Sequence, residues 1–302
     1  MSKRPAAGPG LALALAAPVA FTFFNAGVRL VAGEMSVLGL LLARGFMGLL
    51  LAGAVSLFLR ARPWSKNKKS LSLIGFAGVL SSVCSTAGFT LIPLYQAVVV
   101  LYLYPAMTVL LSAAITKEKI TPGGLLGVML SFGGCLVMVW PDGSSQGPSL
   151  QIGHLFSFMG GLLYALTFVL ARRLGAENRG LEPLFFFSVF AVLGAVPLSL
   201  LSGVPLGLDG AAEVFHAGLL GLVGALAKLL VFAALRYLPP HKVGVVGTLE
   251  ILGGALFSLL FFGDAFGVRS VIGGLMIIYA VFGFHRPPAN DREEKSAPGI
   301  EK

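Results

Sequence analysis

Three ionisable side chains lie deep inside long apolar stretches of this sequence: Arg44, Lys228 and Glu250. A charge at the centre of a bilayer costs about 2.5 to 3.5 kcal/mol on insertion scales, so such residues are expected to face the protein interior. Lys228 stands 8 residues before the last basic residue of its stretch, and Glu250 stands 8 residues after the first basic residue of the next. At 1.5 Å per residue, both then lie about 12 Å from the same interface. This spacing predicts a Lys228–Glu250 ion pair, or a site that both share with a substrate.

Each of these charges has a structural and a functional interpretation. A Lys228–Glu250 pair could only lock two helices together, or a ligand charge could compete with one partner while Glu250 exchanges a proton during a transport cycle. Arg44 lies 8 residues from the opposite end of its own stretch, so we expect it at a different depth. It could snorkel or lock helices, or it could hold a carboxylate with its planar fork of donors.

Polar and aromatic side chains at similar depths complete a candidate cavity. The predicted substrate-binding residues are Lys228, Glu250, Arg44, Asn25, Tyr102, Tyr104, Tyr164 and Gln96. Aromatic residues in the middle of a membrane segment also serve to pack helices, and that alternative stays open. We predict no catalytic residue, no metal site and no cofactor. The sequence contains neither a Walker A loop nor a His-Glu-x-x-His motif, so transport driven by ATP is not expected.

The composition indicates what surrounds these charges. Of the 302 residues, 56% are hydrophobic and only 12% are charged, and the mean hydropathy is +0.89. Soluble domains carry about 25% charged residues, and half that supply cannot cover a water-soluble globule of this size. The chain is therefore predicted to be a polytopic membrane protein whose partner is the lipid bilayer. The net charge of +9 comes from basic residues between apolar runs, which indicates topology signals rather than a nucleic-acid partner.

Ten segments are long and apolar enough to cross a bilayer, which takes about 20 residues. We therefore predict an all-α fold with ten transmembrane helices, over residues 10–30, 36–59, 71–93, 95–115, 121–140, 153–172, 183–202, 213–236, 242–263 and 268–285. With both termini in the cytoplasm, 18 of the 22 Lys and Arg residues lie on the cytoplasmic side, and only Arg29 and Arg269 lie on the other. This asymmetry predicts a multi-pass protein of the cell inner membrane with both termini cytoplasmic.

The two halves of the chain resemble each other. Gly10 to Arg29 aligns with the stretch from Gly153 to Arg172, 143 residues later, and Glu118 aligns with Asp264, 146 residues later. An odd number of helices in each half inverts the second copy, so we predict two inverted five-helix repeats, an arrangement typical of secondary transporters. The predicted organisation is a cytoplasmic tail (1–9), a first repeat (10–140), a periplasmic linker (141–150), a second repeat (151–285) and a cytoplasmic tail (286–302).

Short motifs in both halves carry a family resemblance. They are Ala-Arg-Gly-Phe at 43–46, Tyr-Pro at 104–105, Lys-Glu-Lys-Ile-Thr at 117–121, Leu-Glu at 249–250 and Gly-Asp at 263–264. In their order and spacing they resemble the drug/metabolite transporter superfamily, EamA type, over about residues 10–285. The family usually has Pro where Ile251 stands and Glu where Asp264 stands, which weakens any transfer of a specific substrate. The resemblance implies two five-helix halves, a cavity between them, and export or uptake of small organic metabolites.

The resulting functional prediction is a secondary transporter of small organic metabolites, such as amino acids or similar zwitterions, working by alternating access. Export is implied by the resemblance alone, and protons are a candidate coupling partner. One alternative is an exporter of drugs or other cationic compounds, for which Glu250 alone would supply the binding charge. From other classes, a lipid-modifying intramembrane enzyme and a purely structural membrane subunit are the competing interpretations. The enzyme lacks a convincing acid/base or metal constellation.

Overall fold

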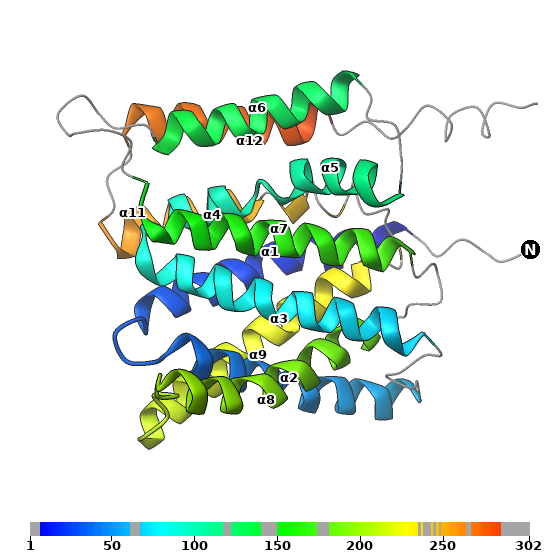
Figure 1. Cartoon of the computed structure of the whole chain (residues 1–302), viewed down its shortest axis with the longest axis vertical. Coiled ribbons are helices and arrows are strands. Elements are labelled where there is room, and N and C mark those ends of the chain that lie inside the picture. Colours follow the sequence, from blue (N-terminus) through cyan, green and yellow to red (C-terminus); the bar gives the residue numbers. More distant parts are fainter. Residues whose placement is uncertain are drawn as a thin grey trace, which may run out of the picture.

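The computed structural model of the chain is built of long helices that run side by side in several layers (Figure 1). It describes residues 7–60, 67–116, 122–139, 150–173, 181–234, 237, 243, 246–247, 249–263 and 267–284. The helices are α1 (Ala7–Leu30), α2 (Val37–Leu59), α3 (Lys68–Leu91), α4 (Leu94–Leu101), α5 (Tyr104–Thr116), α6 (Pro122–Val139), α7 (Ile152–Arg173), α8 (Leu181–Ser202), α9 (Ala211–Ala234), α11 (Leu249–Phe261) and α12 (Val268–Phe284).

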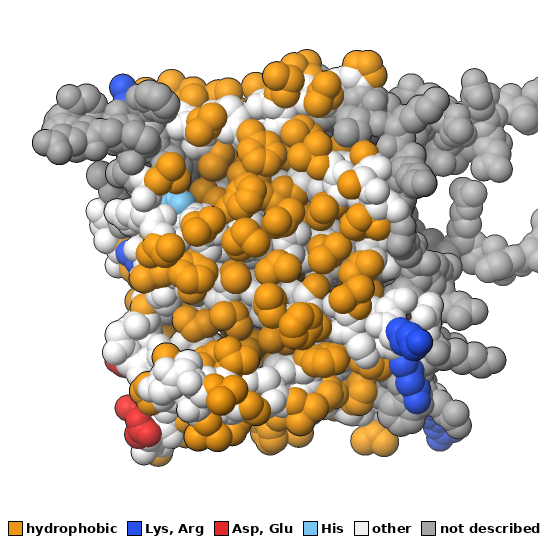
Figure 2. Space-filling model, in the orientation of Figure 1, with side chains coloured by type: hydrophobic (Ala, Val, Ile, Leu, Met, Phe, Trp, Pro, Cys, Tyr) orange, Lys and Arg blue, Asp and Glu red, His pale blue; other side chains and the backbone are white. Residues whose placement is uncertain are grey.

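The surface of the bundle suits a lipid environment. In the described residues, seven segments are long and apolar enough to span a membrane, and three further apolar helices are shorter. Figure 2 shows hydrophobic side chains over most of the visible face along the helices, with charged side chains at its edges. A water-soluble protein rarely exposes a contiguous apolar surface of this extent. The chain is thus an all-helical, multi-pass membrane protein.

Most contacts between helices join an early helix to a late one. α3 packs along α7 and α8, α2 along α8 and α9, and α1 along α9 and α11, while α6 and α12 pair at one side of the bundle. Small residues permit the closest approaches, as is usual between membrane helices. A Cβ at Gly221 of α9 would lie only 2.6 Å from the carbonyl oxygen of Ala43 in α2.

The fourth predicted span is not one continuous helix. Residues 94–116 form α4 and α5, with a turn at Tyr102 and Leu103 between them. Pro105 explains the break, because proline lacks the N–H that would bond the carbonyl of Leu101 and its ring clashes with that carbonyl. Gly161 of α7 packs against the freed carbonyl, and a Cβ there would lie 2.6 Å from it. The break places Tyr102 and Tyr104 at the centre of the bundle.

The other described helices fall close to the predicted spans, within a few residues at each end, which is the usual uncertainty of helix boundaries. The ninth span, expected over 242–263, contains the described helix α11, Leu249–Phe261. Helix α2 begins where expected because Ser36 caps it, its hydroxyl accepting the N–H of Gly39 at 3.1 Å. The aligned acidic residues Glu118 and Asp264, residues 1–6 of the first predicted tail and the whole second tail (286–302) lie outside the described residues.

Candidate functional site

A cavity of about 60 Å³ lies among the central helices, which is room for about four or five water molecules. Its walls come from α1, α2, α3, α4, α5, α7, α9 and α11 and from residues 243 and 247. Along α1 the lining runs from Ala14 to Asn25, a length of about 16 Å at 1.5 Å per residue. Seven of the predicted site residues line it: Asn25, Arg44, Tyr102, Tyr104, Tyr164, Lys228 and Glu250.

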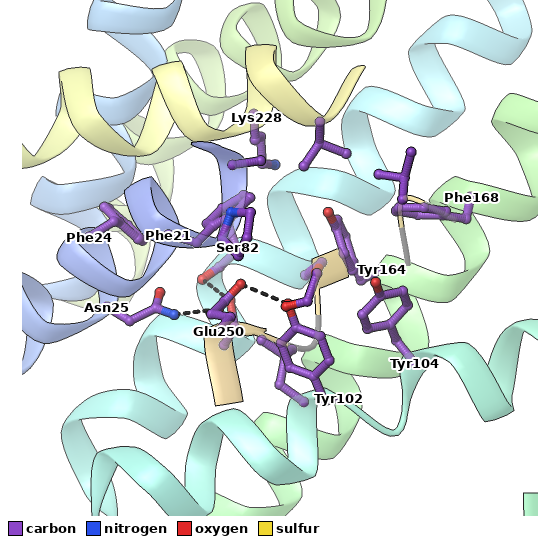
Figure 3. A pocket seen from close by; sticks show the side chains of 18 of the residues that line it. Phe21, Phe24, Asn25, Ser82, Tyr102, Tyr104, Tyr164, Phe168, Lys228 and Glu250 are labelled. Atoms are coloured by element: carbon purple, nitrogen blue, oxygen red, sulfur yellow. Dashed lines mark hydrogen bonds between the residues drawn. The ribbon is translucent and has the colours of Figure 1, made fainter. Parts of the chain in front are cut away.

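Glu250 anchors one wall of this pocket. Its Oε1 accepts a 2.6 Å hydrogen bond from Nδ2 of Asn25, and its Oε2 accepts a 2.9 Å bond from the hydroxyl of Tyr102 (Figure 3). Tyr102 OH also lies 2.5 Å from the carbonyl oxygen of Gly247. Both carboxylate oxygens therefore have partners, and those partners come from helices α1 and α4. A buried carboxylate with two such donors is positioned rather than free to swing.

Arg44 enters the pocket from α2 through a ring of aromatic faces. Its guanidinium carbon lies 4.4 Å from the ring centre of Phe24 and 5.6 Å from that of Phe187, a geometry that favours a cation electrostatically. Nη1 donates to Oγ of Ser82 at 3.2 Å, and Nη2 donates to the carbonyl of Gly224 at 3.4 Å. Nε is buried and has no hydrogen-bond partner. The protein thus uses only some of the hydrogen-bond donors of the Arg44 guanidinium group.

The ion pair predicted between Lys228 and Glu250 is wrong. No salt bridge joins Lys228 to Glu250, although the structure describes both residues. Instead Nζ lies 3.3 Å from the ring centre of Phe187, while the carboxylate is bonded to Asn25 and Tyr102. The positions along the chain correctly predicted that both charges lie in one pocket, but they contain no information on the ring of Phe187 and the amide of Asn25 that the charges contact instead. Arg44, expected at another depth, reaches the same Phe187 ring as Lys228.

Aromatic side chains form the wall that continues from Tyr102. The ring of Tyr104 lies 5.3 Å from Tyr102 and 5.0 Å from Tyr164, and Tyr164 lies 5.0 Å from Phe168, all between ring centres. The tilted and edge-to-face angles are those that aromatic pairs prefer. Figure 3 shows Tyr104, Tyr164 and Phe168 together on the side of the pocket away from Asn25. The pocket therefore has a polar end and an aromatic end.

Gln96, the eighth predicted residue, lies outside the lining of this pocket. Its Nε2 donates to the hydroxyl of Tyr95 at 3.0 Å, and its Oε1 lies 3.1 Å from Nε2 of His154. The hydroxyl of Tyr95 also lies 3.4 Å from Oγ of Ser270. Gln96 thus connects α4 with α7 and, through Tyr95, with α12, and its amide is already engaged on both sides.

Sequence reasoning missed several residues of the site. Phe24 and Phe187 receive the cations, and Ser82 accepts from Arg44. The three serines Ser81, Ser82 and Ser85 line the pocket from one face of α3. Their spacing within an otherwise apolar segment is a signal that could have indicated this face. The phenylalanines carry no such signal, because phenylalanine is one of the commonest residues of this chain.

Beyond Asn25, Arg29 ties three elements together at the next turn of α1. Its Nη1 donates to the carbonyl oxygens of Phe89 and Ile92, and its guanidinium carbon lies 5.9 Å from the ring centre of Phe262. These carbonyls belong to the C-terminal end of α3, which lacks intrahelical donors. Arg29 therefore binds α1 to the ends of α3 and α11 on this side of the pocket.

Comparisons with known proteins show which family and which solved structure this chain resembles. The EamA-like transporter family matches the chain twice, over residues 8–140 and 151–285. The chain is 24% identical over 283 residues to the pseudopaline exporter CntI of Pseudomonas aeruginosa, covering 92% of this chain and 96% of that protein. It is 26% identical over 253 residues to the uncharacterized transporter YyaM of Bacillus subtilis, covering 77% and 79%. One solved crystal structure superposes with a TM-score of 0.57 at 18% identity, covering 89% and 94%.

Proposed function

Because the chain belongs to the EamA-like transporter family, of the drug/metabolite transporter type, we propose that it is a secondary active transporter that exports small organic metabolites across the inner membrane. Amino acids and similar zwitterions are the proposed substrates. The observation that carries the proposal is the central pocket, where a carboxylate and two cations lie buried within an apolar bundle. Ionisable groups inside a membrane protein mark substrate or ion pathways because their burial is costly.

The packing of the helices supports two inverted repeats. If the second repeat copies the first, α1 corresponds to α7 and α3 corresponds to α9. The contact between α1 and α9 is then the counterpart of the contact between α7 and α3, and both are among the extensive interfaces of the bundle. The break between α4 and α5 at the pocket also fits, since secondary transporters place discontinuous helices at their substrate sites. Tyr102, at the break of one half, bonds Glu250 at the start of α11 in the other.

In a transporter that works by alternating access, the pocket is closed toward one side of the membrane while it opens toward the other. Arg29 joins α1, α3 and α11 on one side, whereas the lining extends along α1 in the other direction to Ala14. We assign the Arg29 side to the closed end of this conformation. With both termini in the cytoplasm, that closed end is the periplasmic one.

Export as the direction draws on the relative named as a pseudopaline exporter. Membership in a transporter family also favours transport over the alternative of an intramembrane lipid-modifying enzyme.

Counterflow in proteoliposomes tests the function. Vesicles containing the full chain are preloaded with single compounds from a panel of amino acids, organic acids and quaternary amines, and uptake of the same labelled compound is followed. A carrier accumulates the label transiently, whereas an enzyme yields a changed product and a structural subunit does neither. Accumulation of quaternary amines alone would establish the cationic alternative, and no accumulation of any compound in vesicles with folded protein would refute transport of these classes.

The same vesicles test whether Glu250 couples transport to protons. Glu250→Gln keeps the shape of the side chain and cannot ionise, so we expect transport to fall and its dependence on pH to flatten. Glu34→Gln, an exposed carboxylate on the connection after α1, serves as the matched control and should keep the profile of the unmodified protein. An unchanged rate and pH profile for Glu250→Gln would remove this carboxylate from the mechanism.

A further inference from the structure

The charges that line the pocket do not balance. Arg44 and Lys228 are 4% and 7% exposed, and no carboxylate of the described residues lies within ion-pair distance of either. Glu250, the one carboxylate among the described residues of the lining, is bonded instead to Asn25 and Tyr102. A buried charge without a partner of opposite sign is strongly unfavourable, and proteins pair such charges or use them to bind ligands. The protein therefore leaves an excess of positive charge at one end of its pocket.

Hydrogen-bond donors that the protein does not use also indicate a binding site for an anion. Nε of Arg44 is buried, lies in a pocket-lining side chain and has no hydrogen-bond partner. Nη2 reaches its backbone acceptor only at 3.4 Å, which is at the long end of the hydrogen-bond range. The ammonium of Lys228 rests on the ring of Phe187, and Figure 3 shows this side chain on the pocket side opposite Tyr102. An aromatic face stabilises a cation but supplies no acceptor oxygen, so both cations keep donor capacity for a ligand.

We propose that the substrate is an organic anion that carries more carboxylate than ammonium groups. One carboxylate binds between Arg44 and Lys228, and Ser82 supports the Arg44 side. An ammonium group, where the substrate has one, lies at Glu250. The aromatic wall of Tyr104, Tyr164 and Phe168 takes the carbon skeleton. This assignment rests on the proposed transport function and narrows its substrate class. It replaces zwitterions in general by amino acids with an extra carboxylate and related anions, because a strict zwitterion would leave the second cation uncompensated.

Binding to the purified full chain tests the assignment without depending on transport. Thermal unfolding is followed in detergent with succinate, L-glutamate, L-glutamine and tetraethylammonium at equal ionic strength. A ligand that binds only the folded protein raises its Tm. We expect succinate and L-glutamate to raise the Tm by a few degrees and the other two probes to leave it unchanged. Stabilisation by L-glutamine or tetraethylammonium equal to that by L-glutamate, or no stabilisation by either anion, would overturn the proposal.

Variants locate the effect within the pocket. Lys228→Met keeps the length of the side chain and removes its charge, and it should raise the apparent Kd for L-glutamate about 10- to 100-fold, as expected for loss of a charged hydrogen bond. Arg44→Gln should act similarly. Lys68→Met, an exposed lysine at the start of α3, is the matched control and should leave the Kd unchanged. Since removal of a buried unpaired charge does not threaten folding, the Lys228→Met protein remains testable.

Different results would refute the proposed transport function and the proposed anionic substrate. If the counterflow panel shows transport of neutral zwitterions or cations while L-glutamate neither binds nor moves, the transport function stands and the anion assignment is wrong. If L-glutamate binds in a manner that requires Lys228 but no compound of the panel accumulates, the site is real and the transport function is wrong. Unchanged binding of L-glutamate to both Lys228→Met and Arg44→Gln would reject the cation pair as its site.

Discussion

Glu250 and Lys228 lie in the same pocket, yet their surroundings are opposite. Glu250 has both oxygens bonded, to an amide of α1 and a phenol of α4. Lys228 faces the ring of Phe187, and its neighbour Arg44 keeps one nitrogen without a partner. A polar group that the protein satisfies contributes to the folded structure, whereas one that the protein leaves unsatisfied lowers stability until a ligand binds. The carboxylate end is therefore structural as well as functional, and the cationic end is chiefly functional.

The helices that carry the carboxylate and the helices that carry the cations also differ in how they are held together. The residues that satisfy Glu250 come from α1 and α4 and hold three helices in one arrangement. The cations come from α2 and α9, which approach closely because Gly221 and Gly224 have no side chain. Close backbone contact fixes where the cations stand, but no bond between the cations and the carboxylate fixes one end of the pocket to the other.

The largest expected difference between the two ends is in stability. Glu250→Ala leaves the amide of Asn25 buried without its acceptor, while the hydroxyl of Tyr102 keeps only the carbonyl of Gly247, so the free energy of unfolding should fall by about 1 to 3 kcal/mol. Lys228→Met strands no donor or acceptor of the described residues, and we expect a stability equal to or above that of the unmodified protein. Thermal or denaturant unfolding in detergent measures both. Equal losses of stability in Glu250→Ala and Lys228→Met would contradict the proposed difference between the carboxylate and the cations.

A second test moves the cationic end without changing any charge. A Cβ on Gly224 would lie 2.8 Å from ring carbons of Phe24 and 3.0 Å from Nε of Arg44. Gly224→Ala should therefore shift the guanidinium and weaken L-glutamate binding about tenfold, the equivalent of 1.4 kcal/mol. In α2, a Cβ on Gly53 would meet nothing within 4 Å, so Gly53→Ala should bind normally and gain about 0.5 to 1 kcal/mol of stability.

Titration of L-glutamate against both glycine variants gives the two apparent Kd values. The comparison would be wrong if Gly224→Ala bound L-glutamate as tightly as Gly53→Ala, since the position of Arg44 would then not matter to the ligand.

The sequence predicted the helices better than the partners within the site. Long apolar runs report membrane helices directly, because the bilayer requires about 20 apolar residues in each. The helix positions were therefore close, and the break between α4 and α5 falls beside Pro105, a proline expected to kink its span. The charges in apolar runs also indicated where the pocket lies, and seven of the eight predicted site residues line it. Which charge meets which partner depends on helix rotation and packing, and a depth count along the chain contains neither. That is why Lys228 meets Phe187 rather than Glu250.

The smallest expected effect separates two neighbouring tyrosines at the carboxylate end. The hydroxyl of Tyr102 bonds Glu250 at 2.9 Å and the carbonyl of Gly247 at 2.5 Å, whereas Tyr104 contributes its ring to the aromatic wall. Tyr102→Phe should lower the free energy of unfolding by about 0.5 to 1.5 kcal/mol, while Glu250 keeps its bond from Asn25. Tyr104→Phe, which retains the ring, should change it by less than about 0.5 kcal/mol. Denaturant unfolding of both variants measures the difference. If Tyr104→Phe proved the more harmful, the stability of this end would depend on the Tyr104 hydroxyl, and the bonded carboxylate would lose the structural role assigned to it.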